Sequence, residues 1–156
     1  LYTILLMAFF IGYSLLISVV WLGTGELAVF HMGLLFLSED DVLVRFFIAF
    51  LTSTVVMLTV SSLCFYISTI SKNSVTPIII TISTVFVGTA ISIIPIEFFK
   101  IINPYLFTGY INSYLSAFHD PIPYDAILRL LLICILWTGA FLTFAFNHFI
   151  KKDITD

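Results

Sequence analysis

Hydroxyl-bearing and small side chains are the residues of this chain that could do chemistry, because they recur at helical spacing inside long apolar runs. One face, following Pro77 at intervals of four, three, four and four residues, consists of Thr81, Thr84, Gly88 and Ser92. A looser face in the preceding run consists of Thr52, Thr59, Ser62, Tyr66 and Thr69. Such faces let helices approach closely and hydrogen-bond. Two interpretations stay open: packing within a bundle, or the lining of a substrate path at a subunit interface.

Catalytic and metal-binding groups do not form any recognisable motif. The histidines (His31, His119 and His148) have no ligand spacing, so no metal or cofactor is expected. Cys64 and Cys134 fall in apolar runs and are expected to pack rather than to react. Neither a Gly-x-Ser-x-Gly nor a Gly-x-x-x-x-Gly-Lys sequence occurs, so we expect no enzyme and no ATP hydrolysis by this chain.

The composition places these faces in a membrane. The 156 residues are 61% hydrophobic and only 10% charged, with a net charge of −3. A soluble domain contains about 25% charged residues, so this chain cannot cover a water-facing surface. No basic patch indicates a nucleic-acid partner. The partner that the composition requires is a lipid bilayer.

Four long apolar stretches are each long enough to cross about 30 Å of hydrocarbon as a helix. We expect spans at about 1–22, 44–70, 75–94 and 127–150. The fold class is therefore an all-α integral membrane protein, a bundle of four transmembrane helices in a single domain, 1–156. No Asp, Glu, Lys or Arg lies deep in a span, so this chain is not expected to use an ion gradient itself. Because the first residue is Leu1 and not Met, we expect a fragment of a longer protein.

The connections carry the polar and aromatic residues. The 96–118 region contains Pro104 and several Asn, Ser and Tyr residues, which predicts two short interfacial or re-entrant helices before the last span. A fifth full span is the alternative. Gly23–Glu26 is expected to end the first span, and 27–37 to lie at the interface. Ser38 resembles an N-cap followed by an acidic first turn.

The basic residues that could set the membrane orientation are divided equally between the two sides. Lys72, Lys151 and Lys152 fall on one side, and Arg45, Lys100 and Arg129 on the other. The two lysines that directly follow the last span favour a cytoplasmic C-terminus under the positive-inside rule.

The order of these features resembles the C-terminal part of the type-2 ABC transporter permease family. The likeness rests on the polar hairpin Ser68–Ser74, the Pro-bounded aromatic region, and the terminal Lys151-Lys152-Asp153-Ile154 after an aromatic span end. The resemblance implies that the four spans match the last four of six. It implies a bacterial plasma-membrane location with a cytoplasmic C-terminus, a second permease subunit in a homo- or heterodimer, and a partner ATP-binding cassette ATPase.

On this resemblance the chain is expected to be the permease subunit of an ABC exporter, forming the substrate path while the partner supplies energy. The Thr81 to Ser92 face would then lie at the dimer seam or path, and the Thr52 to Tyr66 face is a second candidate. Cytoplasmic contacts are expected at Lys72, Asn73, Lys151 and Lys152. The alternative is a non-transporting membrane assembly or immunity protein that binds a partner. An intramembrane lipid enzyme ranks last, because hydroxyls alone are poor acid–base groups.

Overall fold

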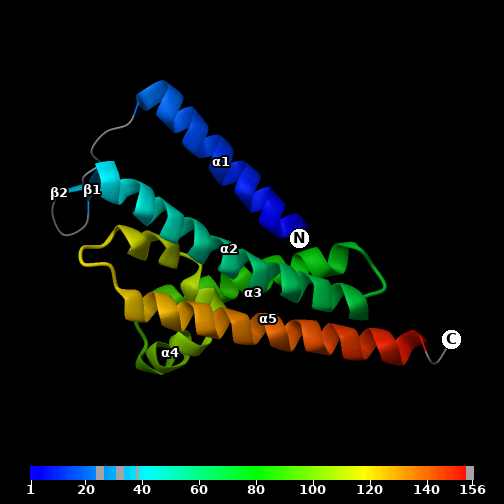
Figure 1. Ribbon diagram of the computed structural model, residues 1–156. Helices are drawn as coiled ribbons and strands as arrows, with labels where there is room; N and C mark the ends of the chain where they lie inside the picture. Colours follow the sequence, from blue (N-terminus) through cyan, green and yellow to red (C-terminus); the bar gives the residue numbers. More distant parts are fainter. Residues whose placement is uncertain (24–26, 31–33, 38, 154–156) are drawn as a thin grey trace.

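Four long helices dominate the computed structural model, which describes residues 1–23, 27–30, 34–37 and 39–153. They are α1 (Tyr2–Leu22), α2 (Glu39–Ile70), α3 (Val75–Ile93) and α5 (Tyr124–Asp153). Each is long and apolar enough to cross a membrane. The expectation of a helical membrane bundle with four spans is confirmed, and Figure 1 shows α2, α3 and α5 side by side with α1 leaning away.

The helix ends follow local sequence. α1 stops at Gly23, which has a φ of 77° and donates its N–H to the carbonyl of Val19, so the predicted glycine stop is confirmed there. The second glycine of that expected turn lies outside the described residues. α2 begins at Glu39, and the proposed N-cap Ser38 also lies outside them. At 32 residues, or about 48 Å, α2 is longer than the hydrocarbon layer.

A small hairpin fills the interval between α1 and α2. Strands β1 (Leu27–Phe30) and β2 (Leu34–Leu37) pair antiparallel, with Leu27 opposite Leu37 and Phe30 opposite Leu34. Four residues span only about 13 Å, so neither strand can cross a bilayer. The sequence indicated a short apolar stretch here but not its strand pairing.

The core lies between α2 and α5. Its buried apolar members from the two helices are Val56, Leu63, Leu130, Cys134 and Phe141, and Phe107 joins them from the segment before α5. Cys134 is free and fully buried, so its predicted packing role is confirmed. Between Tyr2 and Trp21, α1 has no buried residue, and it is joined to α2 by a 3.2 Å hydrogen bond from Thr3 Oγ1 to Ser61 Oγ.

The segment between α3 and α5 consists of short helices, as predicted. There are four elements rather than two: α4 (Glu97–Ile102), η1 (Asn103–Tyr105), η2 (Phe107–Tyr110) and η3 (Ser113–Phe118). The count was wrong because prolines, glycine and asparagines interrupt the segment every few residues, which limits each piece to a turn or two. None of these elements is long enough to be a fifth span.

The segment between α3 and α5 packs along the sides of these two helices and does not lie across their ends. Phe107 is only 4% exposed, and its ring packs edge-on against Trp137 and Phe141, with centroids 5.9 and 6.0 Å away. Trp137 lies thirteen residues into α5, about 20 Å along its axis. Thr108 packs against Gly88 on α3. The 96–118 region therefore packs along α3 and α5, as expected of a re-entrant segment, and we call it the re-entrant segment.

The chain crosses the bundle an even number of times. The turn between α2 and α3 and the C-terminal end of α5 lie at one end of the bundle, whereas the hairpin and α4 lie at the other (Figure 1). The polar turn around Lys72 and the lysines after the last span thus belong to the same end.

Candidate functional site: a groove between α1, α2 and the re-entrant segment

One wall of a groove between α1, α2 and the re-entrant segment comes from α1. The α1 residues that line it recur every three or four positions and so share one helix face: Met7, Phe10, Ile11, Ser14, Leu15 and Ser18. Two serines on this face are the only polar side chains that the helix contributes. Because α1 is apolar on all sides, the helix can face lipid and the groove at once.

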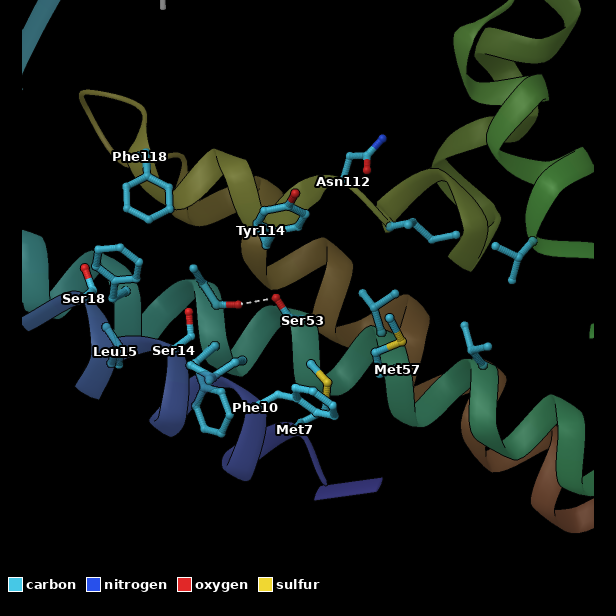
Figure 2. Close-up of a pocket in the computed structure, with 18 residues that line it drawn as sticks. Met7, Phe10, Ser14, Leu15, Ser18, Ser53, Met57, Asn112, Tyr114 and Phe118 are labelled. Carbon is cyan, nitrogen blue, oxygen red and sulfur yellow. Dashed lines mark hydrogen bonds between the residues drawn. The ribbon is translucent and has the colours of Figure 1, made fainter. Parts of the chain in front are cut away.

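The floor comes from the middle of α2. Its lining residues are Phe46, Ala49, Phe50, Ser53, Val56, Met57 and Val60. Ser53 donates its hydroxyl to the carbonyl of Ala49 at 2.6 Å, so its oxygen can still accept a hydrogen bond. Figure 2 shows Ser53 on α2 with Met7 and Phe10 of α1 projecting toward the same helix.

The opposite wall is the re-entrant segment, which contributes Ile111, Asn112, Tyr114 and Phe118. Phe118 packs edge-on against Phe46, with ring centroids 5.2 Å apart. Tyr114 and Phe118 project from this segment toward α2 (Figure 2). Val85 adds a contact from α3.

Arg45 holds that wall in place. Its side chain is 8% exposed, and its Nη1 donates to the carbonyl oxygens of His119 at 2.6 Å and Ala117 at 3.3 Å. Its Nη2 lies 3.5 Å from Asp120 Oδ1, whose side chain is largely exposed. A buried guanidinium that donates to several acceptors holds them firmly, because hydrogen bonds from charged donors are stronger than those between neutral groups. Arg45 therefore ties the start of α2 to the end of η3.

The groove is large and electrically neutral. Its volume is about 750 Å³, within the range of small-molecule sites. The described lining contains no Asp, Glu, Lys, Arg or His, and its polar groups are three serines, one asparagine and one tyrosine. Such a surface can hold an apolar or neutral amphiphilic molecule and hydrogen-bond its polar end. It offers a charged ligand no counter-charge.

The predicted face on α2 packs inside the bundle. Thr52 and Thr59 are 2% and 0% exposed. Thr59 Oγ1 lies 3.0 Å from Thr138 Oγ1 and 3.2 Å from the carbonyl of Cys134, both on α5. Ser62 is buried, and the Tyr66 ring stacks on Phe141. These contacts fit the packing interpretation, and a role at a path or dimer seam stays a prediction.

The predicted face on α3 is divided. Thr81 and Gly88 are buried, and Gly88 abuts Thr108 of the re-entrant segment within the same chain. Thr84 and Ser92 are half-buried and donate their hydroxyls to the carbonyls of Ile80 and Thr89. Whether the remaining surface of this face meets a second subunit stays a prediction.

The proposed cytoplasmic contacts gather at one end. Lys72 and Asn73 are exposed on the turn between α2 and α3, where Asn73 Oδ1 accepts the N–H of Val75 at 3.2 Å. Lys151 is exposed at the end of α5, and Lys152 continues the same helix. The four residues thus belong to the same end of the bundle (Figure 1).

Sequence reasoning missed the residues that build the groove. Ser14, Ser18 and Ser53 lie in apolar runs, and only the first two are spaced one helical turn apart, a much shorter hydroxyl pattern than the one on α3. The available signal was the spacing of Met7, Phe10, Ser14 and Ser18 on one helix face, but an all-apolar helix gives such a face no contrast. Arg45 carried a clearer signal, since it is the last charge before a long apolar run.

No family model, curated protein or solved structure matches this chain. The features that can indicate a function are therefore the groove, the membrane-spanning helices and the position of the charged ends.

Proposed function

We propose that this chain is a membrane-spanning permease subunit of an ATP-driven exporter, and that the groove between α1, α2 and the re-entrant segment is its substrate path. The observation that carries the proposal is a neutral hollow of about 750 Å³ bounded by spanning helices. Packed membrane bundles use small residues to close such spaces. Here α1 instead diverges from α2, and large side chains line both walls without filling the gap.

The lining selects for the substrate class. A molecule in the groove would lie against phenylalanine, methionine and aliphatic side chains, with hydroxyl groups from Ser14, Ser18 and Ser53 available to a polar end. A charged group would lose its hydration there without gaining an opposite charge. The substrate is therefore a neutral apolar or amphiphilic molecule.

Energy for uphill export would come from a partner. Between Phe46 and Ile70, and between Val75 and Ile93, no ionisable side chain is present that could couple movement to an ion gradient, apart from Tyr66 and Cys64. The turn at Lys72 and the end of α5 form the surface that would face an ATP-binding cassette ATPase on the cytoplasmic side. A second permease subunit would complete the path, in a bacterial plasma membrane with the C-terminus inside.

Transport by the complete complex tests this proposal. The chain, purified with its native partners and reconstituted in proteoliposomes, should move a neutral hydrophobic dye only when ATP is supplied. A Ser53→Trp variant places an indole in the floor of the groove and should abolish this movement. Ser83→Trp makes the same change at an exposed position on α3 away from the groove and should leave it intact.

Two outcomes would contradict the proposal. If both tryptophan variants transport at the wild-type rate, the groove is not the path. If the complex assembles with its partners but shows no ATP-dependent movement of any neutral probe, the protein belongs to the class of membrane assembly or immunity proteins.

A further inference from the structure

A second, polar pocket lies at the beginning of the last spanning helix, apart from the groove. It has a volume of about 420 Å³ and is bounded by the first turns of α5 and by the η1 and η2 elements of the re-entrant segment. Its polar side chains are Asn103, Tyr110, Asp125 and Arg129. None of these residues lines the groove.

Two opposite charges line this pocket. Asp125 and Arg129 lie one helical turn apart on α5, and both side chains are exposed. Neither side chain forms a hydrogen bond or an ion pair within the described part of the chain. The pocket therefore presents one carboxylate and one guanidinium side by side, with no net charge.

A third group lacks a partner although it is buried. Asn103 Oδ1 is shielded from solvent and accepts no hydrogen bond from any residue that the structure describes. Leaving such an acceptor unpaired costs free energy unless a donor reaches it. Gly109 packs directly against this amide, so a side chain at that position would displace it.

The remaining polar group shapes the pocket. Tyr110 donates its hydroxyl to the carbonyl of Pro104 at 2.7 Å, which fixes the ring as a wall. Burial raises the pKa of Tyr110, and the Arg129 guanidinium opposes this only in part, so the phenol stays protonated at neutral pH.

The length of α5 puts the expected level of the lipid headgroups at its first turns. α5 has 30 residues and is about 45 Å long, which matches a bilayer including its polar layers. Asp125 and Arg129 are in its first two turns, and exposed tyrosines at positions 105 and 124 flank them. Tyrosine is enriched at this level of membrane proteins.

We propose that this pocket binds the phosphoethanolamine headgroup of a bilayer lipid, with the phosphate against Arg129 and the ammonium shared by the Asp125 carboxylate and Asn103 Oδ1. A guanidinium suits a phosphate because it presents several donors in one plane. A primary ammonium carries three N–H donors, so it can neutralise Asp125 and satisfy the buried Asn103 oxygen together.

This arrangement discriminates between related headgroups. Phosphocholine has the same charges but no N–H, so it would leave Asn103 Oδ1 unpaired. Phosphoglycerol lacks the cation and would place its phosphate beside an uncompensated Asp125. A site that must satisfy a buried acceptor rejects a ligand that lacks the donor.

Lipid retention by the full chain tests the site. The protein, purified in detergent with equal amounts of phosphatidylethanolamine and phosphatidylcholine of identical acyl chains, is examined by native mass spectrometry. We expect about tenfold preference for phosphatidylethanolamine, the effect of one charge-assisted hydrogen bond. Asp125→Asn and Arg129→Gln should each remove the preference. Glu97→Gln and Lys100→Gln change exposed charges on the neighbouring α4, outside the pocket, and should retain it.

A competition arm separates a lipid from a soluble zwitterion. Free phosphoethanolamine, added at the concentration of the lipid, should displace little of it, because the acyl chains contribute to binding. Complete displacement would show that the pocket takes a soluble ligand and would overturn the lipid assignment. Equal retention of both lipids, or equal losses in the pocket and α4 variants, would overturn the site itself.

Discussion

Substitution of Gly88 by alanine probes how tightly the re-entrant segment is held against α3. A Cβ added at Gly88 would collide with three side-chain atoms of Thr108, and the farthest of them, Cγ2, would be only 2.6 Å away. Real Cβ atoms essentially never come within 3.0 Å of such neighbours. Neither partner is the far end of a flexible side chain, so η2 or α3 must move by several tenths of an ångström.

The expected magnitude follows from that displacement. Overpacking a tight contact costs about 1–3 kcal/mol. Glycine to alanine in a helix also gains up to about 1 kcal/mol from helix propensity, which hides part of the cost. Gly139→Ala on α5 is the matched control, because its Cβ would meet no atom within 4 Å. We expect Gly88→Ala to be about 1–3 kcal/mol less stable than Gly139→Ala.

The assay is equilibrium unfolding in mixed detergent micelles, followed by circular dichroism. A Thr108→Gly background removes all three colliding atoms, so the cost of Gly88→Ala should largely disappear there. Equal stability of Gly88→Ala and Gly139→Ala would refute the close approach of the re-entrant segment to α3. An equal cost of Gly88→Ala in both backgrounds would refute the assignment to Thr108. The result is needed before a bulky Gly88 variant is used to test a dimer seam, because such a variant disturbs the single chain first.

Three further predictions concern other contacts. Thr59→Val removes the hydroxyl that joins α2 to α5 and should destabilise the bundle by about 0.6–1.7 kcal/mol in the same assay. The control Thr143→Val removes a hydroxyl that bonds within α5 and should cost less stability. Equal losses of stability in the two variants would contradict the interhelical role of Thr59. Arg45→Gln should accelerate hydrogen exchange of the backbone amides at 117–120 about tenfold, because the charged donors that hold this stretch are lost. An unchanged exchange rate would show that Arg45 does not position residues 117–120. A cysteine introduced at Asn73 should react with an impermeant maleimide only from the cytoplasmic side, and labelling from outside would reverse the proposed topology.

The long helices could be predicted from sequence because they depend on one strong signal. Charge-free runs of about twenty residues require spanning helices, and the observed bounds of α1 and α3 lie within one or two residues of the expected spans. α2 and α5 extend further because acidic residues in their first turns, and lysines in the last turn of α5, interact favourably with the helix dipole. The glycine stop at Gly23 was similarly local, since it depends on one backbone conformation.

The groove could not be predicted, because it depends on distance between helices and not on residue types. Nothing in the sequence indicates that α1 diverges from α2, and the α1 face lining the hollow is no different in polarity from the faces that meet lipid. In a soluble protein, a face that meets the solvent is polar, so hydropathy would distinguish it from a face that lines an apolar hollow. In a bilayer both surfaces are apolar, so hydropathy loses this information.

Tertiary contacts also decided the role of the hydroxyl residues. Regular spacing predicted a contact face on α3, but not that its partner at Gly88 is the re-entrant segment of the same chain. Likewise Thr59 lies on a predicted face, and only the structure pairs it with Thr138. Arg45 was expected at a helix end, but its buried contacts with the residues before α5 depend on how the chain returns to α2.

The most direct test of the account is a reversible cross-link across the groove. Cysteines at Ser14 on α1 and Ser53 on α2, joined by a reducible bifunctional maleimide, would hold the two walls together in the reconstituted complex. We predict that the cross-linked complex loses ATP-dependent movement of the neutral dye and regains it after reduction. Undiminished transport with the cross-link complete would contradict the claim that substrates pass through this groove.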